Sequence, residues 1–532
     1  MDHDAARRRI LRAAAAASAG GVLGAGWPWA SAHGATSAWG EVPAGVWPAG
    51  AAFTPPPAFK ILEIHLYGGL SPWETFYFRA GPGYRGFESG ASPLTSFPGL
   101  AFNAACAGAP AATDVPRIFD TTDAAHPVQF GPITAPLWTP AIFDRTRVIV
   151  LQHDLLPHEA AIPYAGSGFR LGNPKLAGLG AAIQRRALAI EETKPAAMRR
   201  RIPFAFVLRP LAGDIPGDNV QVFSATGQHP GSSRPVVIDS DATGNLLSML
   251  DRSNPANPRI TPEADQVFNY YRSQYRDLLR FAGGGDPVRS RGFADYDAAA
   301  GNLISASLLL SLLQAAPLTP AAEAHCARIG GGAFVSQTNV TGNAIRLAAH
   351  LLAHPTTPAT YVGVIDGGLV GTAGGGYDTH NAGHVLATSV NLLNVLSTLR
   401  ALVDGGLLDL STTMVVLTTE FGRTPYRSSG GAPNAGSDGR DHWPRGFVNV
   451  LIGGPVVQRG VVGRLRDSDG IAEPARVFNC SDVRAAVLLA AGIFPFASEL
   501  FGTTDITSAL IDMASHDGTA RNLRRTLLGV PG

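Results

Sequence analysis

Carboxylate and imidazole side chains follow an apolar, strand-like run at residues 412–419. The run leads directly to Glu420, and the pair Asp441 and His442 follows 21 residues later in a Gly-rich stretch. Carboxylate oxygens and imidazole nitrogens are ligands for zinc, manganese or a pair of such ions. An ion bound there could polarise an ester and activate a water or hydroxyl nucleophile. This stretch therefore predicts part of a hydrolytic metal site.

A second group of ligand-type side chains follows the apolar run at residues 360–366. Asp378 and His380 are two positions apart, so an extended segment would direct both side chains to the same side. His380 and His384 are four positions apart and would share one face of a helix that begins early. We expect these three residues to belong to the same metal site as Glu420.

Each candidate ligand also has a structural alternative. Asp378 could cap a helix N-terminus. Glu420 could form an ion pair with Arg423, and Asp441 with His442 could order its own loop. One shared site is favoured because ligands of open α/β sheets bind beyond the carboxyl ends of the strands.

Two earlier strand-like runs also end at polar residues. The run at 60–67 precedes two hydroxyls and a carboxylate, Ser71, Thr75 and Glu74. We interpret the hydroxyls as candidate nucleophiles and Glu74 as a candidate metal ligand.

The run at 147–152 opens into His153 and His158. Histidines at such positions are more often packing or hydrogen-bonding residues than ligands. We therefore expect both, with Arg423, to support the ligands from behind. His65, inside its run, is expected to be a core histidine.

Strand-length apolar runs alternate with segments of helical periodicity, above all from residue 342 onward. This alternation predicts an α/β fold with a mainly parallel sheet and helices on both faces. We expect one domain at 60–532, with a loop-rich insertion at about 81–140 and a Pro/Gly-rich segment at 33–59. The remaining expected strands lie at 203–208, 235–239 and 447–452, and the expected helices at 264–282, 296–316, 342–354, 383–407 and 481–492.

The composition is that of a loop-rich globular protein. Charged residues make up 16% of the chain, which contains 62 Gly and 40 Pro. The net charge is +1, and it becomes −1 without residues 1–32, which carry four Arg and two Asp. Neither value indicates a nucleic-acid partner. The three cysteines show no CxxC spacing and allow one disulfide, whose pair the sequence does not select.

Residues 1–32 are typical of a twin-arginine export signal. They contain RRRILR at 7–12, an Ala/Gly-rich run at 13–26 and a small-residue cleavage site at 30–32. The run is too short and too weakly apolar to predict a membrane span in the mature chain. We expect a periplasmic or extracellular protein, for which a co-exported protein is one candidate partner.

Five motifs carry a family resemblance: GGLSPWETF (68–76), GGYDTHNAGH (375–384), TTEFGRTP (418–425), GRDHWPRGF (439–447) and GGPVVQRGVVG (453–463). Together they resemble the exported bacterial family known as domain of unknown function 1501, whose members resemble alkaline phosphatases and sulfatases in fold. The resemblance implies a three-layer α/β/α sandwich with a metal site at the carboxyl edge of its sheet.

The resemblance also implies roles for individual residues. His442 resembles the late histidine ligand of the phosphatases, and Asp378 with His380 or His384 resembles their intervening ligands. Glu420 stands where phosphatase relatives carry an Asp-His pair, but the next residue here is Phe421.

The start of the chain differs from those relatives. Tyr67 and Gly68 stand where they place a first-strand aspartate, and Glu74 stands where the family has a later one. No sulfatase-type Cys-x-Pro-x-Arg motif is present, which argues against formylglycine chemistry.

The sequence therefore predicts an exported metal-dependent hydrolase of phosphate or sulfate esters, acting on a small molecule or a polymer. The alternative is a non-catalytic exported binding or assembly protein that keeps the fold. The expected cofactor is a divalent metal, zinc or manganese. Its expected ligands are Glu74, Asp378, His380, His384, Glu420, Asp441 and His442.

Overall fold

The structure is a computed structural model of the 532-residue chain. It describes residues 38–48, 55, 59–79, 100–111, 114, 116–170, 178–195, 198, 204–209, 235–239, ten positions between 263 and 278, 322–329, 334–355, 358–370, 375–380, 383–426, 439–497, 500 and 505–531. The predicted signal at 1–32, most of the segment at 33–59 and the helix expected at 296–316 lie outside these residues.

The centre of the fold is an eight-stranded sheet with the order β16-β5-β15-β12-β1-β11-β6-β7. Neighbouring strands are parallel except where β15 pairs with β12 and β5. The strands are β1 (Lys60–Leu66), β5 (Thr146–Leu151), β6 (Ala205–Arg209), β7 (Val236–Asp239), β11 (Tyr361–Asp366), β12 (Thr413–Thr418), β15 (Phe447–Gly453) and β16 (Gly460–Val462). The mainly parallel α/β fold is confirmed.

Both faces of the sheet are buried, which explains why its strands are continuous apolar runs. Successive side chains of a strand point to opposite faces. Leu62 and Ile64 of β1 accordingly belong to one hydrophobic core and Ile61 to the other.

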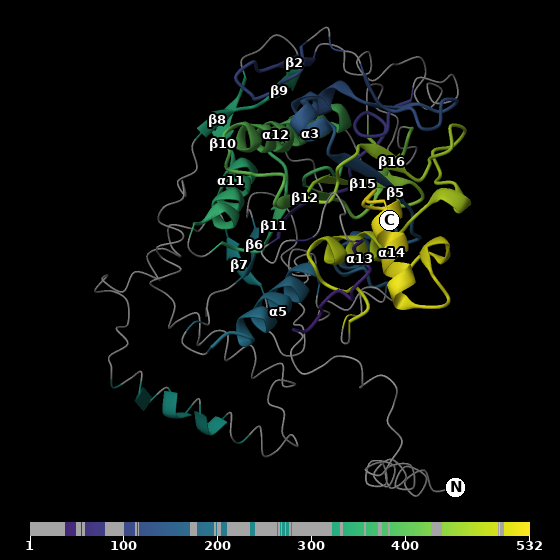
Figure 1. Ribbon diagram of the computed structural model, residues 1–532. Helices are drawn as coiled ribbons and strands as arrows, with labels where there is room; N and C mark the ends of the chain where they lie inside the picture. The colour runs from purple at the N-terminus through teal and green to yellow at the C-terminus, as the bar shows by residue number, and fades with distance from the viewer. Residues whose placement is uncertain are drawn as a thin grey trace, which may run out of the picture.

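Helices cover the two faces of the sheet (Figure 1). On one face lie α11 (Val340–Ala353) and α12 (His384–Asp404). The other face carries α4 (His158–Ser167), α5 (Leu179–Glu192), α13 (Cys480–Ala490) and α14 (His516–Thr526). The expected helices at 342–354, 383–407 and 481–492 correspond to α11, α12 and α13.

One described helix, α12, is long and apolar enough to cross a membrane, but 78% of its most apolar window is buried inside the fold. That burial is typical of the core helix of a globular protein.

The region predicted as a loop-rich insertion contains short elements where it is described. These are β2 (Leu100–Phe102), β3 (Arg117–Asp120), β4 (Val128–Phe130), η1 (Pro132–Leu137) and α3 (Pro140–Phe143). Cys106 of this region forms a disulfide with Cys326, and Cys480 is free and buried. The disulfide pair, which the sequence left open, is thereby assigned.

The sheet topology brings distant segments to one edge. Strands β1, β5, β11 and β12 run in the same direction, so the residues that follow them meet at their carboxyl ends. The antiparallel strand β15 begins at the same edge. The short strands β13 (Gly422–Arg423) and β14 (His442–Trp443) pair just before it.

Candidate metal centre

Four side chains from three separate segments converge at this edge of the sheet. His158 is the first residue of α4, after β5. Asp378 and His380 lie in the segment that joins β11 to α12, and His442 lies on β14. Each offers a ligand atom, and these atoms lie within 4.8 Å of one another. Ligands on opposite sides of one ion are about 4–4.4 Å apart for bonds of 2.0–2.2 Å, so the four side chains need to move only a few tenths of an ångström to bind one ion.

The imidazole nitrogens that face the centre are close to each other and to Asp378. His380 Nε2 lies 2.8 Å from His442 Nε2. Asp378 Oδ1 is 3.2 Å from His380 Nε2 and 3.8 Å from His442 Nε2. Asp378 Oδ2 is 3.5 Å from His158 Nε2, a buried nitrogen with no hydrogen bond. All three Nε2 atoms thus surround one carboxylate.

The opposite ring nitrogen of each histidine faces a group that only accepts hydrogen bonds. Nδ1 of His442 lies 2.7 Å from the carbonyl oxygen of Leu156. Nδ1 of His380 is 3.1 Å from Asp441 Oδ1, and Nδ1 of His158 is 2.9 Å from Glu420 Oε1. We therefore assign the proton of each neutral imidazole to Nδ1, which leaves an Nε2 lone pair directed at the centre.

With these tautomers, the histidines are suited to bind a metal ion between their Nε2 atoms. Two Nε2 lone pairs at 2.8 Å repel each other unless a cation or an added proton lies between them. Histidine ligands of metals commonly donate their other N–H to a carboxylate or a backbone carbonyl. All three imidazoles have that arrangement, so the residues fit a divalent ion.

Charge around His158 depends on two carboxylates. Burial opposes protonation of His158, but the nearby carboxylates of Asp378 and Glu420 outweigh it and raise its pKa to about 9. A metal ion that binds Nε2 would therefore displace a proton from the metal-free ring. Burial likewise opposes ionisation of Glu420, yet the hydrogen bond from His158 and nearby imidazoles lower its pKa to about 2. The cluster therefore attracts positive charge at neutral pH.

Arg423 fixes the orientation of Asp378. Its guanidinium contacts Asp378 Oδ1 and the Gly68 carbonyl, and donates to the Arg440 carbonyl at 3.0 Å. Burial would raise the pKa of Asp378, but the neighbouring imidazoles of His158 and His442 and the charge of Arg423 lower it. Arg423 pairs with Asp378, whereas the sequence alternative paired it with Glu420.

Gly68 allows the close approach of two segments. Its φ is +105°, and a Cβ atom there would lie 2.3 Å from the backbone nitrogen of Asp378. Its own N–H donates to Glu420 Oε1 at 2.8 Å. A glycine is therefore required at this position after β1.

Glu420 and Asp441 lie around the four-residue cluster and are absent from it. Glu420 is fully buried and holds His158, while Asp441 holds His380. The side chains of Asp441 and His380 are 46% and 38% exposed, so the centre opens to solvent on their side.

Glu74 and His384 lie together in a separate buried network. Glu74 Oε2 is 3.6 Å from His384 Nε2, and Glu74 Oε1 is 3.1 Å from a nitrogen of Arg440. Burial would raise the pKa of Glu74, but Arg440 and His384 lower it to about 2. Helix α12 begins at His384, so His384 and His380 do not share a helical face.

The two predicted nucleophiles belong to the same network. Ser71 and Thr75 are fully buried. The Ser71 hydroxyl donates to Glu74, and the Thr75 hydroxyl donates to the Ser71 carbonyl at 2.6 Å. Both hydroxyls thus donate hydrogen bonds to neighbouring residues of their own segment.

His153 supports the site through the backbone. Its Nε2 lies 2.6 Å from the Glu420 carbonyl oxygen, and burial lowers its pKa to about 4. The neutral ring therefore donates to this carbonyl and holds the turn after β12 in place.

Two groups at the site were missed by sequence reasoning. The Leu156 carbonyl orients His442, and no side-chain pattern marks a backbone acceptor. The ring of Phe421 lies 4.2 Å from that of His442 and 4.9 Å from that of His158, measured between centroids. Phe421 therefore forms an apolar wall behind the imidazoles.

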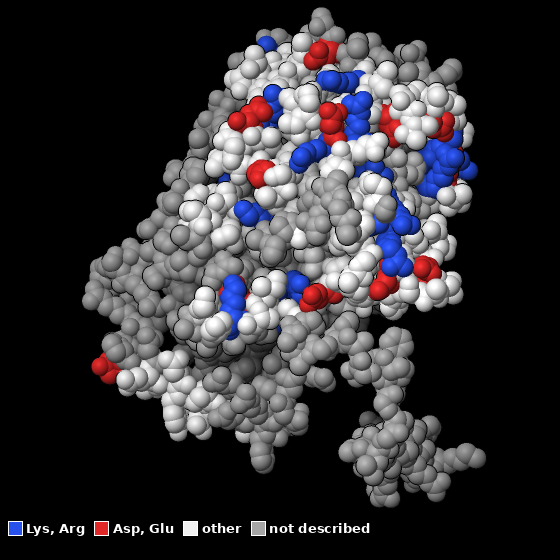
Figure 2. All heavy atoms as spheres, in the orientation of Figure 1, with Lys and Arg blue, Asp and Glu red and all other residues white. Residues whose placement is uncertain are grey.

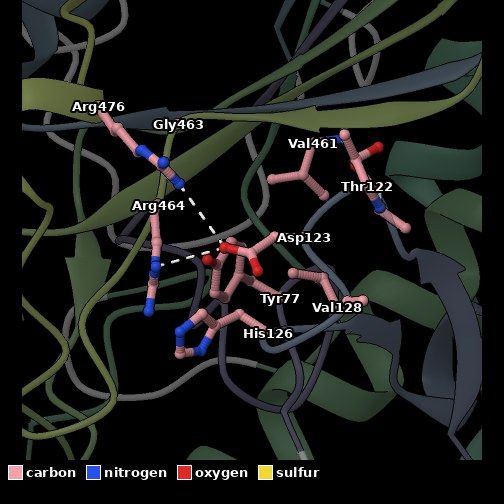
Figure 3. A pocket seen from close by; sticks show the side chains of 11 residues that line it. Tyr77, Thr122, Asp123, His126, Val128, Val461, Gly463, Arg464 and Arg476 are labelled. Carbon is pink, nitrogen blue, oxygen red and sulfur yellow. Dashed lines mark hydrogen bonds and ion pairs between the residues drawn. The ribbon is translucent and has the colours of Figure 1, made fainter.

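A solvent-open pocket of about 540 Å³ lies elsewhere, and none of the four ligands lines it (Figure 3). Arg464 and Arg476 extend towards Asp123 at 3.3 and 3.7 Å (Figure 3). Basic and acidic residues are also interspersed over the described part of the face shown in Figure 2. Neither feature forms a basic patch for a polyanion.

Part of the chain is similar to a known family. Residues 356–510 match the model of the family described as protein of unknown function (DUF1501). The matched region contains Asp378, His380 and His442 and ends before the C-terminal helix α14. No curated protein matches the chain.

Proposed function

We propose that the protein is a metal-dependent ester hydrolase whose centre is formed by His158, Asp378, His380 and His442. The observation that carries this proposal is the convergence of three Nε2 atoms on Asp378 while every Nδ1 faces an acceptor. Three imidazoles with one carboxylate favour zinc over manganese, because harder ions prefer oxygen ligands. The described residues contain one such cluster, which accounts for one ion.

A bound divalent ion would supply Lewis-acid polarisation of an ester oxygen and would acidify a water. The chain's own residues supply the remaining functions. Asp378, held by Arg423, anchors the centre, and Phe421 keeps its inner side apolar. Substrate approaches over the half-exposed side chains of His380 and Asp441. Water is the favoured nucleophile, because Ser71 and Thr75 are buried and hydrogen bonded.

The phosphate or sulfate ester class rests on the resemblance to alkaline phosphatase-like proteins. A mainly parallel sheet with helices on both faces and ligands at its carboxyl edge is consistent with such a fold. The Cys106–Cys326 disulfide supports export to an oxidising compartment.

A second candidate function follows from the number of ligands. Four protein ligands complete a tetrahedron, as in structural zinc sites, whereas catalytic zinc sites keep one position open. An exported binding or assembly protein with a structural metal would show this ligand set. In that case a metal binds and no ester is hydrolysed.

The test measures bound metals in mature protein purified without chelators, together with hydrolysis of aryl phosphate and aryl sulfate esters. We expect about one zinc per chain and metal-dependent hydrolysis. His380→Ala should lose both, because His380 is a ligand and is exposed enough for the variant to fold. His516→Ala, on the exposed N-terminus of α14, is the matched control and should retain both.

The outcomes separate the two candidates. Stoichiometric metal without hydrolysis supports the structural role. Absence of stoichiometric metal, or equal metal content in wild type and His380→Ala, overturns the proposed centre.

A further inference from the structure

A row of buried polar side chains runs from the metal centre into the core of the sheet. Each of its members is at most 3% exposed. In order from the centre they are Glu420, His65, Thr418, Glu63, Arg484 and Tyr361.

Strand periodicity and register place these residues on one face. Glu63 and His65 alternate on β1 and share a face. His65 lies beside Thr418 of β12, two residues before Glu420, and Glu63 lies beside Gly363 of β11. A Cβ atom at Gly363 would lie 2.9 Å from the Tyr361 hydroxyl oxygen, so the glycine leaves room for that hydroxyl to reach Glu63.

The contacts are continuous. Glu63 accepts from the Tyr361 hydroxyl at 2.8 Å and pairs with Arg484 of α13 at 2.5 Å. The Thr418 hydroxyl oxygen lies 3.4 Å from both Glu63 Oε1 and His65 Nδ1, and its single proton can serve only one of them. When it donates to Nδ1, the neutral His65 ring carries its own proton on Nε2. His65 Nε2 lies 3.4 Å from Glu420 Oε2. The other oxygen of Glu420 holds His158.

Burying such a row of polar side chains in a protein core costs free energy. A buried ion pair commonly stabilises a fold no better than apolar residues of similar volume, and buried hydroxyl and imidazole groups require partners. The Glu63–Arg484 pair alone would serve stability poorly. Contacts through Thr418 and His65 connect this pair to Glu420, which lies next to the metal centre.

We propose that His65, held by Thr418, is a positioning residue that fixes the Glu420 carboxylate behind His158. The Glu420 oxygen nearest His65 then cannot turn away, and the other oxygen keeps the Nδ1 proton of His158 so that Nε2 faces the metal. The inference rests on the proposed function, because it requires the metal centre.

The experiment measures zinc affinity by competition with a chromophoric chelator and records the visible spectrum of the cobalt-substituted protein. His65→Leu removes the polar contact with Glu420, while His65→Gln retains an N–H donor near the position of Nε2. Loss of an outer partner of a ligand typically weakens metal binding about 10–100-fold. We expect that loss and a changed cobalt spectrum for His65→Leu, and nearly wild-type values for His65→Gln.

Two further variants keep the result interpretable. Ile64→Val changes the same strand on its opposite face and should leave zinc affinity unchanged despite a small loss of stability. Thr418→Val is nearly isosteric, removes the partner of His65 and should weaken zinc binding in the same direction even if His65→Leu fails to fold.

The outcomes distinguish this inference from the proposed function. If wild type binds zinc and both His65→Leu and Thr418→Val bind it equally well with an unchanged cobalt spectrum, the positioning role is wrong and the metal centre stands. If wild type binds no metal, both proposals are overturned.

Discussion

Replacing Asp378 by asparagine should affect metal binding and folding through two different interactions. The carboxylate is the anionic member of the ligand cluster, and it also pairs with Arg423, whose side chain is fully buried. Asp378→Asn keeps the size of the side chain but removes both interactions. The two effects can be separated by a second change at Arg423.

The expected loss of metal affinity follows from the number of ligands. Structural zinc sites with four ligands bind with about 10–16 kcal/mol, or roughly 2.5–4 kcal/mol per ligand. Since 1.4 kcal/mol corresponds to about a tenfold change, Asp378→Asn should weaken zinc binding by about 60-fold or more.

The expected loss of stability follows from the unpaired cation. Removing one partner of a buried ion pair costs about 3–5 kcal/mol. Arg423 keeps the carbonyl oxygens of Gly68 and Arg440 as acceptors, so we expect about 3 kcal/mol in the metal-free protein. The double variant Asp378→Asn/Arg423→Gln removes the unpaired charge and retains a donor, so it should recover about half of that loss.

Urea unfolding of metal-free protein and chelator competition measure these quantities separately. The double variant should regain stability without regaining zinc affinity. Wild-type zinc affinity in Asp378→Asn would refute the ligand assignment. A double variant no more stable than Asp378→Asn would refute the argument from buried charge.

Three further predictions address other parts of the fold. Gly68→Ala should destabilise the protein by about 1–3 kcal/mol and abolish zinc binding, because the added Cβ would overlap the backbone of Asp378 at a φ of +105°; unchanged zinc binding by titration would contradict this. Burial raises the pKa of Asp482 from 3.8 to about 6. Its protonated form is therefore favoured by folding, and stability is lost as pH rises through 6. The free energy of unfolding of wild type should fall by up to about 3 kcal/mol relative to Asp482→Asn between pH 4 and pH 7, and parallel pH profiles would refute this. Burial raises the pKa of Cys480 to about 12, so thiol labelling of non-reduced protein should modify no cysteine when native and one when denatured; three modified thiols would disprove the Cys106–Cys326 disulfide.

The strands and helices that position the site could be predicted from local patterns. Residues 414–417 form an uninterrupted apolar run because β12 is buried on both faces, and the long helix after His380 shows its periodicity clearly. Strand direction and sheet order are not local properties. The antiparallel β15 between β5 and β12 shows no signal in its own apolar sequence.

The roles within the site required the spatial arrangement. Glu420 and His158 exchange their expected places, since the histidine faces the cluster and the carboxylate holds it from behind. Glu74 meets His384 and Arg440 across more than 300 residues of chain, so no spacing rule could find that network. The row through His65 depends on β1 lying between β11 and β12.

The end of β12 explains why one ion is favoured over two. The resemblance to phosphatases implies an Asp-His pair after this strand, whereas this chain has Glu420 and Phe421. Phe421 has no ligand atom and packs against His158 and His442. Glu420 accepts from Gly68 and faces His158 and His65, so its oxygens are already engaged. A second ion would have to displace these contacts, and the four ligands that remain are sufficient for one.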